Sequence, residues 1–268
     1  MGRCMQYLFI LGALDIEMMY IKKVVKSAGH SYVEPQADGS RLHPGNAYRA
    51  EHLPLDIKSF PGQVVWVECA LADESVPRSI VVDHHRPGDP GYDMGPESFW
   101  LGSSIGQVCA LLGVRPTKDL LMAAASDHCL GAAYQGLCPG IDPVALSDWR
   151  IFNKCESNRL APNTMRERLT RAFRVVRDLK PIRFGKYEFL DAMDINVPDL
   201  SEASAILGKP IMFSKDDLLE GRRKVGARNG SVEVIADWMS TAADVLKLED
   251  VYGCPTRGYA GAYLPVQR

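Results

Sequence analysis

The sequence of residues 79–85 in this 268-residue chain is Ser79-Ile-Val-Val-Asp83-His84-His85. The apolar part of this run predicts a buried β-strand that ends at Asp83. An acid and two imidazoles at the end of such a strand are costly to bury without partners. A divalent metal is a suitable partner, because carboxylate oxygens and neutral imidazoles are its usual ligands. The alternative is a strand end whose histidines are satisfied by the protein alone, so the rest of the chain has to decide.

The chain on either side of this run alternates short apolar segments with amphipathic ones. Continuous apolar strands between helices are typical of a parallel sheet that is covered on both faces. Residues 36–62 are rich in Gly, Pro and His and are expected to be irregular. We therefore predict an α/β fold with a parallel sheet in the N-terminal part. The expected strands are 7–11, 31–35, 64–68 and 79–83, and the expected helices are 15–28, 98–112 and 118–125.

The pattern changes near residue 161. Thr164-Met-Arg-Glu167 matches a capping box and predicts the start of a helix, which Pro181 ends. Met165, Leu169, Ala172, Val176 and Leu179 form one apolar stripe along this helix, opposite a row of arginines. We interpret it as a linker helix between two domains. The predicted organisation is a catalytic domain over 1–160, a linker helix over 161–182 and a smaller α/β substrate-binding domain over 183–268.

The C-terminal part contains further short apolar segments. They predict strands at 187–190, 211–214 and 224–228, with helices near 200–207 and 232–246. A glycine-rich loop that starts at Gly253 is expected to lead into a final strand. This mixture of strands and helices predicts a second α/β domain.

Acidic and imidazole side chains follow several of the predicted strands. Asp15 and Glu17 follow the first strand, Glu68 ends the third, and Asp127 lies after the helix at 118–125. In an open parallel sheet, ligands bind at the carboxyl ends of the strands. The convergence of these side chains with Asp83 and the two histidines predicts a two-metal site with bridging carboxylates.

This ordered set of segments resembles the DHH phosphoesterase superfamily, which includes RecJ-type exonucleases, oligoribonucleases and family II pyrophosphatases. Val81-Val-Asp-His-His85 is similar to the signature motif of that superfamily. Asp15-Ile-Glu17 stands in the place of its Asp-x-Asp motif, Glu68 in the place of the aspartate that bridges both metals, and Asp127 in the place of the fourth motif's aspartate.

The resemblance implies a hydrolase that cleaves a phosphodiester or phosphomonoester of a nucleotide or short oligonucleotide by metal-activated water. Two divalent metal ions, Mn²⁺ first and Mg²⁺ as the alternative, are expected as cofactors. His85 is then a catalytic residue beside the substrate phosphate, and Asp83 supports it. The metal ligands implied by the resemblance are Asp15, Glu17, Glu68, His84 and Asp127.

The C-terminal part also resembles the substrate-binding domain of this superfamily. Lys224-Val-Gly-Ala-Arg228 is similar to the strand that carries a substrate-binding arginine. The loop with Arg257 and Gly258 stands where relatives have a Gly-Gly-Gly-His loop. These residues, together with Ser104 near a helix start in the first domain, are expected to contact the substrate phosphate. The alternative for both arginines is an ordinary surface position.

Some residues depart from the family pattern. Glutamates stand at 17 and 68 where aspartates are usual, and Leu11 stands where a histidine is often found. His128 is either a compensating metal ligand or a residue that orients a neighbouring ligand. A catalytically degenerate nucleotide-binding protein of the same fold is therefore an alternative. A single-strand exonuclease is another, because residues 150–186 carry eleven Lys or Arg against three acids and such a stripe suits a nucleic-acid backbone.

Bulk properties add little about partners. The net charge of −2 favours no particular class of partner. The seven cysteines are scattered and include no CxxC pair, which predicts reduced thiols in a cytoplasmic protein. The apolar run 7–14 is too short to span a membrane, so no membrane partner is expected. Members of the superfamily that this chain resembles are often dimers, so a homodimer is one expectation.

Overall fold

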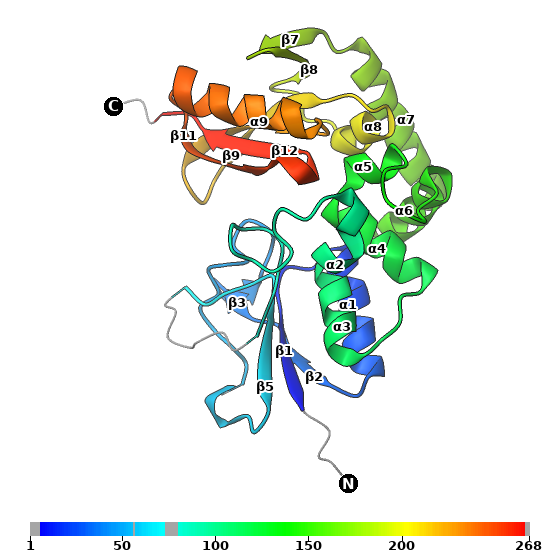
Figure 1. Ribbon diagram of the computed structural model, residues 1–268, viewed down its shortest axis with the longest axis vertical. Coiled ribbons are helices and arrows are strands. Elements are labelled where there is room, and N and C mark those ends of the chain that lie inside the picture. Colours follow the sequence, from blue (N-terminus) through cyan, green and yellow to red (C-terminus); the bar gives the residue numbers. More distant parts are fainter. Residues whose placement is uncertain (1–5, 56, 73–79, 266–268) are drawn as a thin grey trace. The chain divides into compact units, whose positions relative to one another are not determined.

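The computed structural model describes residues 6–55, 57–72 and 80–265, and the fold-class prediction is confirmed (Figure 1). Ser79, the expected first residue of the fourth strand, lies outside the described residues. The chain divides into two compact units, residues 1–94 with 98–128 and residues 95–97 with 129–268. The division therefore falls at residue 128, whereas the sequence pattern places the end of the first domain at 160.

The first unit is built on a four-stranded parallel sheet in the order β2-β1-β5-β6. Leu11 is opposite Val67, and Val67 is opposite Val82, so three strands end at the same level. The strand order reverses between β1 and β5, and open α/β sheets bind ligands at such a switch point. The strands are β1 (Tyr7–Leu11), β2 (Ser31–Val33), β5 (Gln63–Val67) and β6 (Ile80–Val82).

The segment 36–60 covers one face of this sheet. Its described residues contain two short strands, β3 (Gln36–Ala37) and β4 (Ser40–Arg41), and a 3₁₀ helix, η1 (Ile57–Ser59), and are largely irregular elsewhere, as expected. Its apolar side chains pack with Leu8, Ile10 and Trp66 of the sheet. The helices of this unit pack on one another, α1 against both α3 and α4. They are α1 (Ile16–Ser27), α2 (Phe99–Gly102), α3 (Ser104–Leu112) and α4 (Lys118–His128).

The prediction of one continuous helix over 98–112 is wrong, because Ser103 interrupts it. Ser103 has extended backbone angles, and its hydroxyl accepts a hydrogen bond from the N–H of Gly106 (3.1 Å), which caps α3. At Gly102, a β-carbon would lie only 2.6 Å from the ring of His128. The break therefore lets α2 approach a residue 26 positions further along, a contact that no local pattern predicts.

The second unit contains a six-stranded mixed sheet in the order β11-β12-β10-β9-β8-β7. β8 and β9 are parallel, and the other neighbours are antiparallel. Strands β7 and β11 and helices α5 and α6 have no counterpart among the predicted elements. The elements are α5 (Leu130–Tyr134), α6 (Pro143–Asn158), α7 (Pro162–Asp178), β7 (Pro181–Phe184), β8 (Tyr187–Ala192), α8 (Leu200–Ile206), β9 (Ile211–Asp217), β10 (Arg222–Arg228), α9 (Val232–Ser240), β11 (Glu249–Cys254) and β12 (Tyr259–Tyr263).

Helix α7 is the expected helix at the boundary, but it starts differently. Pro162 occupies its first turn and no side chain caps it, so the capping-box prediction is wrong. Its apolar stripe is confirmed, because Leu169, Ala172 and Val176 are buried against α8. The arginines on the opposite face of α7 are exposed: Arg166, Arg171, Arg174 and Arg177.

No helix in the described part of the chain is both long and apolar enough to cross a membrane.

A buried ionic network joins three helices of the second unit. Glu202 on α8 accepts hydrogen bonds from Nε of Arg150 (2.6 Å) and from the hydroxyl of Tyr134 (2.7 Å). Lys154 forms ion pairs with both Glu202 and Asp199. Burial alone would raise the pKa of Glu202, but Arg150 and then Lys154 stabilise its charge and lower the pKa to about 2.

This network makes the second unit sensitive to acid. The pKa of Glu202 is lower in the folded than in the unfolded chain, so its contribution is complete above about pH 4.5 and is lost as the pH falls toward 2. We expect about 3 kcal/mol to be lost over this range, about 1.4 kcal/mol for each pKa unit. Urea unfolding at pH 7 and pH 3 measures the loss. The loss of unfolding free energy between pH 7 and pH 3 should be smaller in Glu202→Gln. An equal loss in both proteins would contradict the assignment.

Candidate metal centre

Four side chains from separate elements of the first unit converge in a buried cluster. Glu17, Glu68, His84 and Asp127 each offer one ligand atom, and these atoms lie within 4.8 Å of one another. Glu17 is in the first turn of α1, Glu68 follows β5, His84 follows β6, and Asp127 is in the last turn of α4. His85 forms a second, overlapping group with Glu68 and His84. Residues remote in sequence therefore meet at one edge of the sheet, as the strand ends predict.

The backbone at Glu68 is strained. Its φ of 52° lies in the left-handed region, which residues with a β-carbon seldom occupy. The neighbouring strands hold it there: the N–H of Glu68 donates to the carbonyl of Val82 (3.0 Å), and the N–H of Gly12 donates to Val67 (3.0 Å). A β-carbon at Gly12 would collide with the carbonyl oxygen of Glu68. Such strain is typical of functional positions, and here it occurs at a residue shared by both ligand groups.

Two buried carboxylate oxygens of the cluster lack a hydrogen bond. Oε1 of Glu17 accepts one from the backbone N–H of Ile105 (3.0 Å), but its Oε2 accepts none, and neither does Oε1 of Glu68. An unsatisfied buried polar group costs about 1–3 kcal/mol, and more when it is charged. A divalent cation would satisfy both oxygens, so the donor set fits a metal ion.

The acids of this cluster also repel one another. Burial raises the pKa of Glu17 well above its ordinary value, and the negative charges of Asp127, Glu68 and Asp15 raise it further. Burial and the charges of Asp127 and Glu68 raise the pKa of Asp15 in the same way, although its Oδ1 caps α1 by accepting from Met18 (2.7 Å). Burial raises the pKa of Glu68 as well, despite the nearby positive charge of His85. Such crowding of acids is stable only when protons or cations are bound.

The hydrogen-bond partners of His84 define its tautomer. The carbonyl of Met94 can only accept, so Nε2 of His128 donates to it (2.9 Å). In neutral His128, Nδ1 then accepts from Nδ1 of His84 (2.8 Å). In neutral His84 the lone pair is then on Nε2, which lies 3.1 Å from Asp127 and 3.4 Å from Glu68. In this form, a cation between Nε2 and the two carboxylate oxygens would satisfy the lone pair. His84 would then have the arrangement of a histidine metal ligand.

The contacts of His128 favour a role in orienting His84 over direct binding of a metal ion. The sequence leaves both roles open, and the ligand groups of the described residues do not include His128. Both of its ring nitrogens point to other partners, His84 and Met94. It is fully buried against Gly102, where no side chain interferes.

We expect His128→Ala to lower metal affinity about 10- to 100-fold, because His84 loses the partner that fixes its ring. His128→Asn keeps an acceptor near Nδ1 of His84 and should recover part of the affinity. Isothermal titration calorimetry of the chelator-treated proteins with Mn²⁺ measures the metal affinity of both variants. Equal affinities for His128→Ala and the wild-type protein would contradict the orienting role.

Asp83 is fully buried and positions His85. Its Oδ1 accepts from the N–H groups of His84 (2.7 Å) and His85 (3.1 Å) and lies 2.9 Å from Nδ1 of His85. Although burial opposes it, the hydrogen bonds from His85 and Tyr48 lower the pKa of Asp83. Burial also opposes the charge on His85, but Asp83, Glu68 and Asp127 raise its pKa to about 9. The expected catalytic role thus suits the half-exposed, cationic His85, whereas Asp83 acts through it.

Tyr48 was not among the predicted site residues. Its hydroxyl donates to Oδ2 of Asp83 (2.8 Å), and the guanidinium of Arg86 lies 3.4 Å from its ring centroid. It belongs to the irregular segment 36–60, and 35 positions separate it from Asp83. No local motif marks such a contact, so the sequence gives no signal for it.

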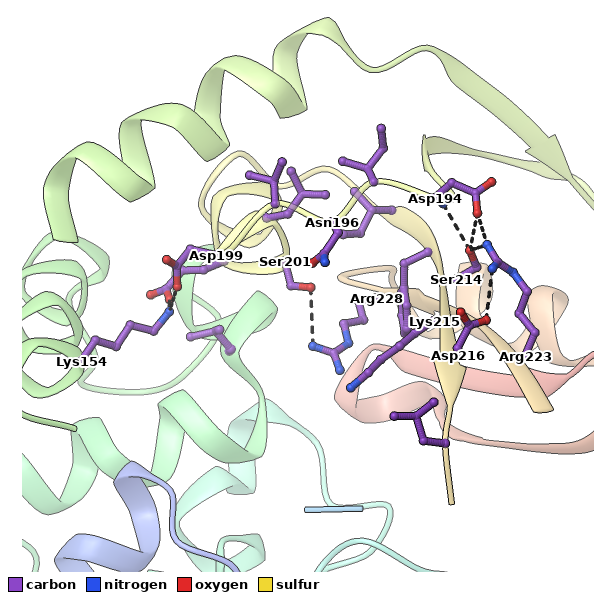
Figure 2. A pocket seen from close by; sticks show the side chains of 18 of the residues that line it. Lys154, Asp194, Asn196, Asp199, Ser201, Ser214, Lys215, Asp216, Arg223 and Arg228 are labelled. Atoms are coloured by element: carbon purple, nitrogen blue, oxygen red, sulfur yellow. Dashed lines mark hydrogen bonds and ion pairs between the residues drawn. The ribbon is translucent and has the colours of Figure 1, made fainter. Parts of the chain in front are cut away.

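The predicted substrate residue Arg228 lines a cavity of about 850 Å³ in the second unit (Figure 2). Its Nη1 lies 3.5 Å from the hydroxyl of Ser201, and its guanidinium is stacked 5.1 Å from the ring centroid of Phe213. Lys215 lines the same cavity. Burial lowers the pKa of Arg228. Arg228 is exposed to solvent and faces this cavity, and a guanidinium in such a position suits an anionic ligand group.

The other predicted substrate residues are elsewhere. Arg257 and Gly258 line a second, smaller cavity of about 360 Å³ in the second unit, which does not include Arg228. Ser104 belongs to the first unit and is fully buried at the start of α3. Its hydroxyl lowers the pKa of Glu68, so it is placed beside the metal ligands and away from solvent.

Comparisons with known proteins add a likeness of fold. The chain matches no family model, and no curated protein matches it. Among solved structures it is similar to a pGpG-specific phosphodiesterase, PggH, from Vibrio cholerae. The sequence identity is 10% and the TM-score 0.42, over 98% of this chain and 94% of that chain. A likeness at this level concerns the path of the chain, and no residue role is transferred from it.

Proposed function

We propose that this protein is a divalent-metal-dependent phosphoesterase of the DHH type that hydrolyses a phosphate ester of a nucleotide or short oligonucleotide. The observation that carries the proposal is the buried cluster of Glu17, Glu68, His84 and Asp127. It supplies the oxygen and nitrogen ligands that Mn²⁺ and Mg²⁺ prefer. It also has carboxylate oxygens without hydrogen bonds, which a cation would satisfy.

The proposed ligands are these four residues, with Asp15 beside them. When bound, the metal ions supply an activated water and neutralise charge on the phosphoryl oxygens. Glu68 belongs to both ligand groups and is the proposed bridge. His85, held by Asp83, presents a positive charge to the phosphoryl oxygens. His128 keeps the lone pair of His84 directed into the cluster.

The second unit is the proposed substrate-binding domain. The cavity around Arg228 combines this cation with apolar walls that include Ile195 and Phe213. Acids also line it, and they are paired with other cations, Asp199 with Lys154 and Asp216 with Arg223. Such a lining suits a phosphate that is joined to a planar, apolar group, as in a nucleotide. Arg257 and Gly258 offer a second contact region in the same unit.

Arg228→Ala should raise the KM for a nucleotide substrate about 10- to 100-fold with little change in kcat, because a hydrogen bond to a charged group contributes about 1.5–3 kcal/mol. Arg174→Ala removes an exposed arginine of α7 and is the matched control. Steady-state kinetics on a dinucleotide separates the two parameters. An unchanged KM would remove Arg228 from the substrate site.

The test of the function is hydrolysis by the purified protein. The substrates are a mononucleotide, a dinucleotide and a longer single-stranded oligonucleotide, each with Mn²⁺, with Mg²⁺ and with a chelator. We expect metal-dependent release of phosphate or mononucleotide, and about two metal ions per chain by elemental analysis. Absence of both metal binding and hydrolysis would overturn the proposal.

The same experiment tests a second candidate function, that of a non-catalytic nucleotide-binding protein with the same fold. Glu17 and Glu68 are longer than the aspartates usual at these positions in similar proteins. Bound nucleotide and metal without turnover would favour that second function. It would retain the cavities of the second unit as the binding region.

A further inference from the structure

Two buried thiols of the second unit face each other and take no part in the proposed function. Sγ of Cys129 lies 3.1 Å from Sγ of Cys138, and both residues are buried, at 1% and 2% exposure. This separation is only about 1 Å longer than a covalent S–S bond of about 2.05 Å. The two sulfur atoms are therefore near bonding distance in the folded chain.

The local backbone produces this approach. Cys129 precedes α5, and the turn after the helix contains Gly136, whose φ of 74° is left-handed. Gly136 donates to Ala133 (3.1 Å) and Leu137 donates to Ala132 (3.0 Å), which is the hydrogen-bond pattern of a Schellman motif. The chain thus turns back on the helix and returns Cys138 to its start.

Hydrogen bonds hold the backbone of both cysteines. The carbonyl of Cys129 accepts from Ala133 (2.9 Å), and that of Cys138 accepts from Ile141 (3.2 Å). The short distance between the sulfur atoms is thus a property of a fixed turn. A bond between them requires the two sulfur atoms to approach each other by about 1 Å.

We propose that Cys129 and Cys138 form a redox-active pair, which a peroxide converts to an intramolecular disulfide. One thiol reacts with hydrogen peroxide to give a sulfenic acid and one water molecule. The other sulfur attacks this sulfenic sulfur, the S–S bond forms and a second water molecule leaves. The two thiols lose two hydrogens and two electrons, which reduce one peroxide to two waters. The sequence alone predicts reduced thiols, and the proposal does not depend on the phosphoesterase function.

Peptide mapping tests the proposal on the intact protein. No Lys or Arg lies between residues 119 and 149, so trypsin keeps both cysteines in one peptide, 119–150. Chymotrypsin then cuts after Tyr134 and separates 119–134 from 135–150. After peroxide treatment and alkylation, we expect these two peptides to remain joined until dithiothreitol is added. Two separate, alkylated peptides would overturn the proposal, and so would a link from Cys129 to another cysteine.

Other cysteines provide matched comparisons. Cys155→Ser on α6 should leave the link intact, and Cys138→Ser should abolish it. Burial raises the pKa of Cys109 to about 11, so its thiol should remain alkylatable after unfolding. Loss of the link in Cys155→Ser would contradict the pairing.

A second readout does not need a variant. A disulfide that closes so short a loop should raise the thermal midpoint of the wild-type protein by about 5 °C, and dithiothreitol should reverse the shift. An oxidised protein whose midpoint does not exceed that of the reduced protein would show that the turn is not preorganised for the bond.

Discussion

His84→Ala will lower metal-dependent hydrolysis about a thousandfold or more. Nε2 of His84 faces both Asp127 and Glu68, and His84 belongs to both ligand groups. Its removal therefore affects every metal position that the cluster can offer. A loss of about 4 kcal/mol of transition-state stabilisation corresponds to this factor. Initial rates with saturating Mn²⁺, together with the metal content of the purified variant, measure the effect.

His52→Ala is the matched control for this experiment. His52 is an exposed histidine of the first unit in the segment 36–60, so its side chain has no role in the cluster. The control should keep wild-type activity and metal content. An active His84→Ala protein with its full metal content would exclude the proposed mechanism.

Glu17→Gln is expected to act in opposite directions on stability and on metal binding. Glutamine can keep the hydrogen bond from Ile105 while it removes one negative charge from a buried group of acids. Without metal, at about pH 7, the free energy of unfolding should rise by about 1–2 kcal/mol. With Mn²⁺ the order should reverse, because the wild-type protein gains binding energy that the variant lacks.

The pH dependence of the unfolding free energy tests the sign of this effect on stability. The pKa of Glu17 is higher in the folded than in the unfolded chain, so the folded state binds the proton more tightly. The metal-free wild-type protein should therefore lose stability as the pH rises above about 4.5, and the variant should lose less. Urea unfolding with a chelator at several pH values measures both proteins. Glu167→Gln, at an exposed site on α7, is the control and should match the wild-type protein. A variant less stable than the wild-type protein without metal would contradict the electrostatic account.

The sequence predicts the first unit well because its signals are local. Apolar runs mark β1, β5 and β6, and the polar residues that follow them meet at one edge, since parallel strands end together. The convergence of Glu17, Glu68 and His84 is therefore predictable from the strand ends, whereas Asp127 is in the last turn of helix α4.

Other parts of the site depend on contacts between distant residues. Tyr48 reaches Asp83 from a segment without a motif, and the role of His128 depends on the carbonyl of Met94. The contact between His128 and Gly102, which the break at Ser103 allows, is also a contact between distant residues. In the second unit, the sequence predicts no strand over 249–252 and a loop from Gly253, because the glycine and polar residues of β11 carry a weak strand pattern.

The contact between Gly102 and His128 has a consequence for how this chain can diverge. A methyl group at position 102 would lie 2.6 Å from the imidazole, so these two sites share one small volume. Descendants that replace His128 with a smaller residue lose the tightest of these contacts, so alanine or serine at 102 then needs only a shift of Met94, whose Cβ would lie 2.9 Å away; those that retain the imidazole keep both contacts. Substitutions at the two sites should thus arise as a pair. Proteins that retain the imidazole at 128 should also retain the glycine at 102.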